Sequence, residues 1–462
     1  MRHASRWTLV AASACLASVA CNDAALFTAP RTFVESVTAD TNSEGSILLH
    51  VMLSAPATVN VDYWTDPAYK LRVRIDELTA QSSIFLPGLR AGRTYVYEVS
   101  AVDASGRMSA TDRGNVATPE LPAALAQVRI TAAGTSGSPL TMLEINGEYH
   151  GFVAVDPAGN PVWKWPTQGI PQGFTRRANG NFVFLDGGYG LFEVSPDGQV
   201  VHELDPLPGG NRIPHHDVVA TQANTLLFLA QEPQTASASS IVGDAIWEWN
   251  PETGAVVKRW NAFDFFDPAV DFGARSLSYD WFHANSLAMG DHGNVILSLN
   301  WLDAVVSIAP DWRSLEWTAG GRQSSFVFDS ASSFQGQHTA ATLPNGHLLL
   351  FDNGRDRTGA ARASRGLEVA LDRAHGTAQA VWSFRPTPNI YAPYIGSARR
   401  LANGSTLVFF GLSASANGAT GPIAGYEVRP DGSVAWQLSV ANVKSVYRAT
   451  PLTSLAGEVL IP

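Results

Sequence analysis

The sequence predicts an all-β protein, in which a six-bladed β-propeller is preceded by a small β-sandwich. The chain has 462 residues, too many for one hydrophobic core. It contains 40 Gly, 27 Pro and 13 Trp, which favours many tight turns and strands, and its 45% hydrophobic content argues against disorder. A unit of short strands recurs along most of the chain, and such a repeat is typical of a propeller.

Residues 1–21 are predicted to be an export signal. Arg2 and Arg6 precede the apolar stretch 8–20, which is too short to remain as a membrane-spanning helix. The stretch runs into Ser-Val-Ala-Cys, which resembles a bacterial lipobox, although the usual Leu three residues before the cysteine is absent. We therefore expect Cys21 to be lipidated and the protein to be a membrane-anchored lipoprotein in the periplasm or at the cell surface. Plain secretion after cleavage of this segment is the alternative.

Charge and cysteine content exclude several classes of protein. The formal net charge of −10 argues against nucleic acid as the main partner, and the sequence has no phosphate-binding glycine loop and no basic stripe. Both cysteines, Cys15 and Cys21, belong to the leader, so the mature chain has no thiol for a disulfide or a metal site. We expect no cofactor and no bound metal, and the sequence does not predict an oligomeric state.

Residues 28–118 are predicted to form the β-sandwich. Residues 47–53 and 59–63 indicate two short strands, the second with alternating apolar and polar side chains. The stretch 86–99, LPGLRAGRTYVYEV, resembles the late strands of fibronectin type III domains, in which a tyrosine hydroxyl binds nearby backbone at a corner of the sandwich. We expect this domain to be a spacer or docking module, joined to the propeller by a linker at 118–122.

Six hairpins between residue 123 and the C-terminus, residue 462, predict the propeller. Each has Pro, Asp or Gly in its turn and a short strand after it, in most copies with an aromatic residue. The turns begin at Asp156, Pro196, Pro251, Pro310, Asp372 and Pro430. A four-stranded blade cannot bury both faces alone, so six blades are expected to stack around a central channel.

Inner strand pairs with an Asn or Gly turn recur in the same region. They lie around 177–182, 224–228, 293–297, 345–349 and 401–406. The first hairpin lacks an obvious inner pair before it, whereas residues 445–462 have inner-strand character but no hairpin after them. We therefore expect the C-terminus to supply the inner strands of the first blade, which closes the ring and protects two sheet edges.

Three histidine blocks precede three of the inner turns. They are Pro214-His215-His216-Asp217, Trp281-Phe282-His283-Ala284-Asn285 and Gly336-Gln337-His338-Thr339. Aligned on the turns, His216 and His338 share one offset, and His283 joins them if its turn, 289–293, carries two extra residues. Neighbours on a strand point to opposite faces, so only one of His215 and His216 is expected to face the channel, and the alignment favours His216. The other blades offer Gln172, Gly396 and a residue near Arg448.

Imidazoles at one mouth of the channel admit three interpretations. A three-His metal site is one, although Asp217 is the only carboxylate expected nearby to orient the ligands. Hydrogen-bonded histidines that simply fill the channel are the second. The interpretation that we prefer is an oxyanion site, with imidazolium and guanidinium groups around the anion and one neutral imidazole as nucleophile.

Several blocks resemble the bacterial arylsulfotransferase family. They are DWFHANSL at 280–287, the run 295–308, WTAGG at 317–321, FQGQH at 334–338 and LFDNG at 350–354, extended upstream by the HHD at 215–217. The resemblance implies a six-bladed propeller and an enzyme that moves a sulfuryl group from a phenolic sulfate ester to a phenol. The reaction would use a sulfated histidine and no nucleotide donor, so the implied partners are a small aromatic sulfate donor and a phenol acceptor.

The resemblance assigns roles to the three histidines. By motif, His338 is the nucleophile, and His283 and His216 bind the sulfuryl oxygens or exchange protons with the phenolic oxygens. His215 is carried along as a substrate-binding candidate.

One feature departs from the family. Family enzymes have an arginine on the strand after the His-x-Asn-Ser block, where this chain has Ser-Leu-Asn-Trp at 298–301. Asn300 thus becomes a substrate-binding candidate, and Arg399, Arg400 or Arg448 is expected to supply the guanidinium from another blade.

The missing arginine keeps other functions open. A non-catalytic surface propeller that binds a protein or a glycan is the main alternative. A quinoprotein or assembly-scaffold propeller is suggested by the tryptophan-containing stretch 246–254, but no regular tryptophan-docking motif recurs in every blade.

Overall fold

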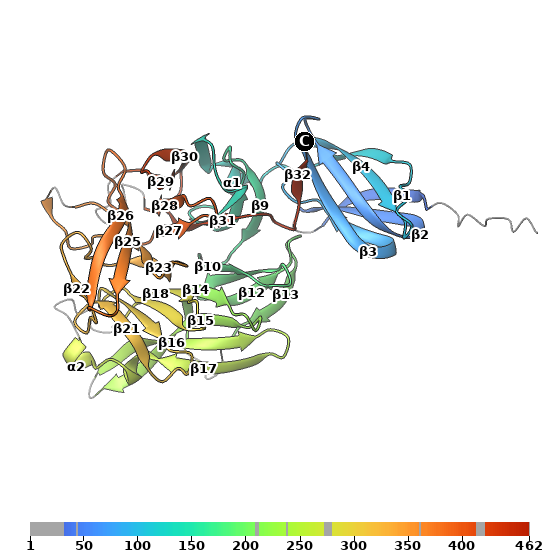
Figure 1. Cartoon of the computed structure of the whole chain (residues 1–462). Coiled ribbons are helices and arrows are strands. Elements are labelled where there is room, and N and C mark those ends of the chain that lie inside the picture. Colours follow the sequence, from blue (N-terminus) through green and yellow to red (C-terminus); the bar gives the residue numbers. More distant parts are fainter. Residues whose placement is uncertain are drawn as a thin grey trace, which may run out of the picture.

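The computed structural model describes most of the chain after the predicted leader. The described residues are 32–42, 45–207, 212–236, 239–271, 280–359, 362–412 and 421–461. They form almost only strands, which make one N-terminal sheet and six further sheets (Figure 1). The all-β prediction is confirmed, while the predicted export signal and Cys21 lie outside the described residues. Within them, no helix combines the length and the hydropathy needed to cross a membrane.

The N-terminal sheet is held together by its long second strand. It has the order β32-β3-β2-β4-β5, with β1 also paired to β2. The strands are β1 (Val34–Thr41), β2 (Ile47–Trp64), β3 (Lys70–Phe85), β4 (Thr94–Val102), β5 (Asp112–Ala117) and β32 (Val459–Ile461). Buried side chains alternate with partly or fully exposed ones along β4, as expected for a strand with one face on a core. The hydroxyl of Tyr95 accepts a hydrogen bond from the Arg90 N–H at 2.9 Å.

The two short strands predicted at 47–53 and 59–63 are in fact the single strand β2. The pairing of β2 with β3 shifts register between Met52 and Ala57. Pro56 has no N–H to donate, and it lies in this irregular stretch, where the regular pairing with β3 is interrupted. One strand therefore runs through the position at which the sequence suggested a break.

Six sheets follow, each with four antiparallel strands, which are consecutive in the chain in all sheets but the first. In order from the innermost strand they are β31 (Ser445–Leu452), β7 (Leu140–Asn146), β8 (Gly151–Val155), β9 (Pro161–Pro166); β10 (Ile170–Arg176), β11 (Phe182–Gly187), β12 (Gly190–Val194), β13 (Val200–Leu204); β14 (Pro214–Ala220), β15 (Leu226–Ala236), β16 (Ser239–Asn250), β17 (Ala255–Asn261); β18 (Ala284–Met289), β19 (Val295–Leu299), β20 (Ala304–Ile308), β21 (Leu315–Gly320); β23 (His338–Thr342), β24 (Leu348–Asp352), β25 (Arg365–Asp372), β26 (Thr377–Phe384); and β27 (Ser397–Arg400), β28 (Thr406–Phe410), β29 (Ile423–Val428), β30 (Val434–Ala441).

The remaining elements are short or lie at sheet edges. They are β22 (Val327–Phe328) on β26, β6 (Arg129–Gly134) on β30, and the short helices α1 (Ala123–Ala126), η1 (Ala262–Asp264) and α2 (Pro268–Asp271). Each predicted outer hairpin is the third and fourth strand of one sheet.

The inner strands form a closed ring. Contacts run from β10 to β14, β18, β23, β27 and β31, and from β31 back to β10. The hydrophobic clusters combine neighbouring sheets; one joins Ile296 and Val305 of the β18–β21 sheet with Leu348 and Leu350 of the next. Each sheet therefore buries a face of its neighbour, which is the packing expected of a propeller.

The chain ends close the ring, as predicted, but with one strand rather than two. β31 is the innermost strand of the first sheet and pairs with β7. The last strand, β32, leaves the propeller and pairs with β3 of the N-terminal sheet. The first hairpin is formed by β8 and β9, and the first sheet also has its own β7 before that hairpin, which the sequence did not reveal.

Side chains join the inner strands around the ring. Most inner strands are interrupted near the middle by a bulge, which leaves a backbone N–H without a ladder partner. In every sheet, with or without such a bulge, a side chain of the preceding sheet accepts a hydrogen bond from an N–H of the innermost strand. The pairs are Glu144 with Gly173 (3.2 Å), Gln172 with His216 (3.1 Å), Asp217 with Leu287 (2.8 Å), Ser286 with Ala340 (3.1 Å), Thr339 with Ala398 (3.0 Å) and Ser397 with Ala449 (3.3 Å).

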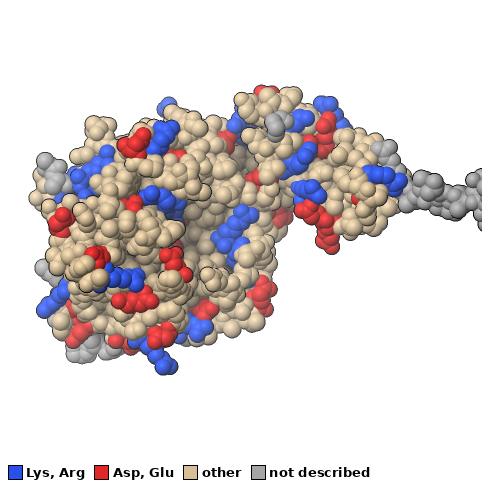
Figure 2. Space-filling model, viewed as in Figure 1, with Lys and Arg blue, Asp and Glu red and all other residues tan. Residues whose placement is uncertain are grey.

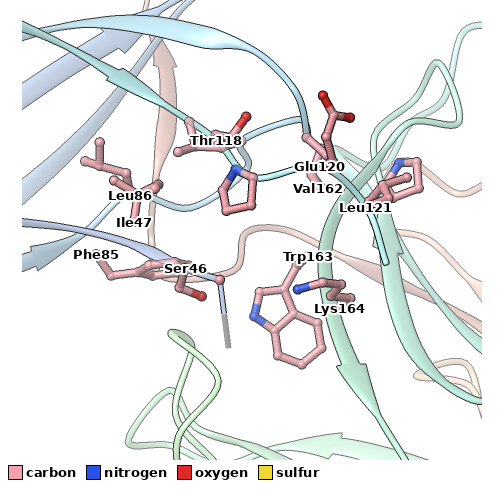
Figure 3. A pocket seen from close by; sticks show the side chains of 15 residues that line it. Ser46, Ile47, Phe85, Leu86, Thr118, Glu120, Leu121, Val162, Trp163 and Lys164 are labelled. Carbon is pink, nitrogen blue, oxygen red and sulfur yellow. The ribbon is translucent and has the colours of Figure 1, made fainter. Parts of the chain in front are cut away.

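The N-terminal sheet packs beside the first propeller sheet. Arg90 donates to Asp156 at 2.8 Å, and the Asn42 amide donates to the Asp197 carbonyl at 2.9 Å. A small cavity of about 80 Å³ lies at this junction, between Ile47 and Phe85 on one side and Trp163 on the other (Figure 3). These contacts and β32 tie the two parts of the chain together.

Candidate active site

The inner turns define where each histidine stands. Backbone hydrogen bonds close three five-residue turns in the same way, Thr221–Thr225, Gly290–Asn294 and Leu343–His347. Counting back five residues from each turn gives His216, Asn285 and His338. The turn after His283 is no longer than the others, so the prediction that it carries two extra residues is wrong. His283 instead lies two residues before Asn285.

The imidazoles of three blades nevertheless come together. The rings of His216 and His283 are 4.7 Å apart between centroids, at 76°. The Tyr447 ring lies 5.9 Å from His216 and 6.4 Å from His338. Tyr447 therefore connects the His216–His283 pair to His338 at one end of the channel. Sequence reasoning had pointed only to a residue near Arg448.

His215 and His216 do not point to opposite faces as predicted. The bulge between His215 and Val218 places His216 at a φ of +62°, which ends the strand alternation. The two rings meet, with Nδ1 to Nδ1 at 2.7 Å, and His215 Nε2 lies 3.0 Å from an Asp244 carboxylate oxygen. His215 is thus buried behind His216 and positions it.

A carboxylate orients His283. The Nδ1 of His283 lies 2.5 Å from Asp280 Oδ2. A carboxylate only accepts hydrogen bonds, so Nδ1 carries the hydrogen and Nε2 is the nitrogen left for other partners. Asp217 is therefore not the only carboxylate near the histidines. The spacing of Asp280 three residues before His283 was visible in the sequence.

His338 is buried and held as one tautomer. Its Nδ1 lies 2.8 Å from Asn353 Oδ1 and 3.2 Å from the Gly336 carbonyl. The Asn353 amide nitrogen donates to two carbonyls, those of Ala392 and Ile395, which fixes the orientation of the amide. Nδ1 is therefore the protonated nitrogen, and Nε2 accepts a long hydrogen bond from the Ile395 N–H at 3.3 Å.

Burial keeps this imidazole neutral. It lowers the pKa of His338 from 6.5 to about 3, opposed by the Asn353 hydrogen bond and assisted by the positive charge of Arg448. Burial and the neighbouring His283 likewise bring the pKa of His216 well below its usual value. A neutral imidazole with an available Nε2 lone pair is what nucleophilic catalysis requires.

Arg448 lies beneath the histidines. It stands in the bulge between Val446 and Ala449, as His216 does in its own strand. Its guanidinium pairs with Asp217 at 2.6 Å and donates to the Asn285 carbonyl at 2.5 Å. The Asp217 carboxylate raises the pKa of Arg448 above its usual value, although burial itself is the largest single effect and acts in the opposite direction. This residue supplies a fixed positive charge beside the histidines.

Asn300 is occupied by protein groups. Its amide nitrogen donates to the Gly336 carbonyl at 3.0 Å, and its amide oxygen accepts from Arg355. The Arg355 guanidinium lies 4.3 Å above the Trp301 ring, and that ring lies 5.6 Å from His283. Asn300 therefore positions the segment before His338, and Arg355 is a nearby guanidinium that sequence reasoning missed. The available signal was its place directly after the LFDNG block.

The other two candidate arginines lie apart from the histidines. Arg399 lines a separate cavity toward the opposite end of the inner strands, and Arg400 is paired with Glu368. Within the described ranges, no three His, Cys, Asp or Glu side chains are grouped so that they could hold a metal ion.

Residues 126–448 match the model of the arylsulfotransferase (ASST) family. This chain belongs to the arylsulfotransferase family. Family membership supports sulfuryl transfer, with an aryl sulfate as donor and a phenol as acceptor. Figure 2 shows acidic and basic side chains interspersed over one face of this member of the arylsulfotransferase family, with no continuous basic surface in that view.

Other comparisons are more distant. No curated protein matches the sequence. Similar solved structures include a protein of unknown function from Bacteroides caccae, with 15% identity over 68% of this chain and 99% of that one, at a TM-score of 0.46. Virginiamycin B lyase from Staphylococcus aureus has 11% identity over 89% of this chain and 99% of that one, at a TM-score of 0.39. A streptogramin B lyase has 12% identity over 88% of this chain and 98% of that one, at a TM-score of 0.38.

Proposed function

We propose that this protein transfers a sulfuryl group from a phenolic sulfate ester to a phenol through a sulfated His338. One observation carries the proposal. His338 is a buried, neutral imidazole whose Nδ1–H is held by Asn353 and Gly336, so that the Nε2 lone pair is directed away from these groups. The donor, the acceptor and the covalent intermediate are chosen because the family acts on such compounds.

In the first step, Nε2 of His338 bonds to sulfur while the bond between sulfur and the phenolic oxygen breaks. The electron pair leaves on that oxygen, which takes the Nε2 proton of His283; His283 enters this step as an imidazolium, with its Nδ1–H on Asp280, and leaves it neutral. The long hydrogen bond from the Ile395 N–H to Nε2 must break before this attack, at a cost of about 1 kcal/mol. The sulfated ring gains positive charge, which the oxygens of Asn353 and Gly336 stabilise through Nδ1–H.

In the second step, the phenol acceptor returns the proton to His283 as its oxygen bonds to sulfur. The bond from sulfur to Nε2 breaks, and its electron pair restores neutral His338. Asp280 holds the Nδ1–H of His283, so Nε2 is the atom that gives and receives the proton.

The sulfuryl oxygens need positive partners throughout. We assign this role to the fixed charge of Arg448, and we assign His216, as a neutral imidazole, a hydrogen bond with the substrate, because both residues lie around Tyr447 with His338. Arg448 would thus replace the family arginine that is absent at Asn300. By analogy with single oxyanion donors, each group is expected to contribute about 3 kcal/mol to stabilisation of the transition state.

The experiment compares wild-type protein with His338→Asn, using p-nitrophenyl sulfate as donor and phenol as acceptor. We expect p-nitrophenolate release to fall at least about 10³-fold in the variant. Mass spectrometry of the wild-type protein after incubation with donor alone should find an added sulfuryl group on the peptide that contains His338. His292→Asn, at an exposed turn position, is the matched control and should keep full activity.

Turnover that survives in His338→Asn would refute the assignment of the nucleophile. No turnover by wild-type protein with several donors and acceptors would refute the enzyme altogether, and would leave the non-catalytic binding propeller as the better account. We also propose export as a lipoprotein through Cys21, on the leader sequence alone; Cys21→Ala should release the protein from the membrane fraction.

A further inference from the structure

A second cavity lies in the channel on the other side of Arg448. It has a volume of about 490 Å³ and is lined by the later parts of β18, β23, β27 and β31. The histidines stand at the starts of their strands, whereas this cavity reaches the turns at Leu343 and Leu401. Asp217, which pairs with Arg448, forms part of its wall, so the Asp217–Arg448 pair separates it from the histidines. We call it the Arg399 chamber.

Arg399 is a guanidinium without a protein partner in this chamber. Among the residues that the structure describes, it forms no hydrogen bond or ion pair, and its Nε is buried without a partner. Arg400 differs, because it is paired with Glu368 and donates to the Gly404 carbonyl. Arg399 as a whole is half-buried, and a guanidinium withdrawn from water in this way is costly unless an anion compensates it.

The neighbouring charges do not neutralise Arg399. The groups that act on it are Arg448, Asp217 and Glu144. Asp217 is already satisfied by Arg448 and by the N–H groups of Val218 and Leu287. Glu144 is the remaining carboxyl, and burial raises its pKa to about 7, so it is protonated much of the time at neutral pH. One positive charge therefore remains in the chamber when Glu144 is protonated.

The walls indicate what kind of anion fits. Leu287, Leu343, Leu349 and Leu401 line the chamber together with several alanines. The other charged residues of the wall, Asp217 and Arg400, are paired with Arg448 and Glu368, so apolar walls surround one unpaired guanidinium. Such a site suits a ligand with one anionic group on an apolar body. We propose that the Arg399 chamber is a second ligand site of this protein, which binds a small organic anion through the Arg399 guanidinium. This site is independent of sulfuryl transfer at His338.

The test measures binding of benzoate by isothermal titration at pH 6, with neutral benzamide in parallel. We expect saturable binding of benzoate and at least tenfold weaker binding of benzamide. Arg399→Gln should weaken benzoate binding at least tenfold. Arg429→Gln, at an exposed arginine, and His338→Asn should bind benzoate as the wild type does.

Three outcomes would overturn the proposal. They are absence of saturable benzoate binding, unchanged binding in Arg399→Gln, and loss of binding in His338→Asn with retention in Arg399→Gln. The last would place benzoate among the histidines. These binding measurements do not depend on turnover. Absence of benzoate binding in the Arg399 chamber can therefore be distinguished from absence of the proposed sulfuryl transfer.

Glu144→Gln provides a second measurement if Arg399→Gln does not fold. Benzoate is ionised at both pH 6 and pH 8, whereas Glu144 gains its negative charge as the pH rises through about 7. Wild-type protein should therefore bind benzoate at least threefold more weakly at pH 8 than at pH 6. Glu144→Gln should bind equally at both values, and a pH dependence that persists in this variant contradicts the proposed charge balance.

Discussion

Replacing His338 by Asn should make the protein less sensitive to acid. The folded-state pKa of His338 is about 3, below its ordinary value of 6.5, mainly because the ring is buried. Between these two values the unfolded chain binds a proton that the folded protein does not. The free energy of unfolding therefore falls as the pH falls from 6.5 toward 3, whereas the amide introduced by His338→Asn binds no proton in either state.

The size of the effect follows from the two pKa values. Their difference corresponds to about 5 kcal/mol when acidification is complete. At pH 5 only the upper part of this window has been crossed, and the contribution is about 2 kcal/mol. Wild-type protein should thus lose about 2 kcal/mol more stability than His338→Asn between pH 7.5 and pH 5.

Urea unfolding followed by tryptophan fluorescence at the two pH values measures this difference. His292→Asn serves as the control, because it removes an exposed histidine of the turn after β18. Glu144 acts in the opposite direction, since its raised pKa makes stability fall as the pH rises from 4.5 through about 7. That contribution is common to all three proteins and cancels. Equal losses in the wild type and in His338→Asn would refute a buried neutral imidazole.

Four further substitutions, one of them a control, test the surroundings of the site and the ring. Asn353→Ala leaves two carbonyls and an imidazole N–H short of a partner, so we expect about 2–3 kcal/mol lower stability and ~10²-fold slower turnover; unchanged turnover would show that the amide does not position the imidazole. Gly396→Ala would place a Cβ 2.5 Å from a buried phenylalanine ring, at a φ of +112°, and should cost at least ~2 kcal/mol in thermal unfolding. Gly432→Ala, where nothing lies within 4 Å, should cost only about 1 kcal/mol, and equal effects of the two changes would contradict the packing argument. Arg177→Met leaves Glu193 buried without its cation and should cost about 3 kcal/mol in urea, which an unchanged midpoint would disprove.

The repeat was readable from sequence because it depends on local rules. Turn residues and period-two alternation mark hairpins without reference to the rest of the chain, and all six outer hairpins occur where they were predicted. Closure by the C-terminus followed from counting strands, although the pairing of β32 with the N-terminal sheet did not. β2 shows the limit of local rules. The sequence suggests two strands there, but a shift in the register of pairing with β3 allows one strand to run through the irregular stretch.

The site depended on geometry that sequence does not carry. Strict strand alternation predicts that His215 and His216 point to opposite faces, but the bulge at His216 brings the two rings into contact. The alignment on turns found the level shared by His216 and His338, yet it could not place Asn285 there in preference to His283. Bulges are set by packing between neighbouring sheets, so a count of residues along one strand does not reveal them.

By itself, the sequence determined the outer hairpins, their repetition, the family resemblance and the three histidines to examine. Only the tertiary structure decided which arginine stands beside them, because Arg448, Arg399 and Arg355 come from strands and loops whose side chains are directed by their neighbours. It placed Arg448 with Asp217 under the histidines, Arg399 in a separate chamber and Arg355 over Trp301. The sequence shows that each arginine carries a positive charge, but only the fold determines which group that charge lies beside.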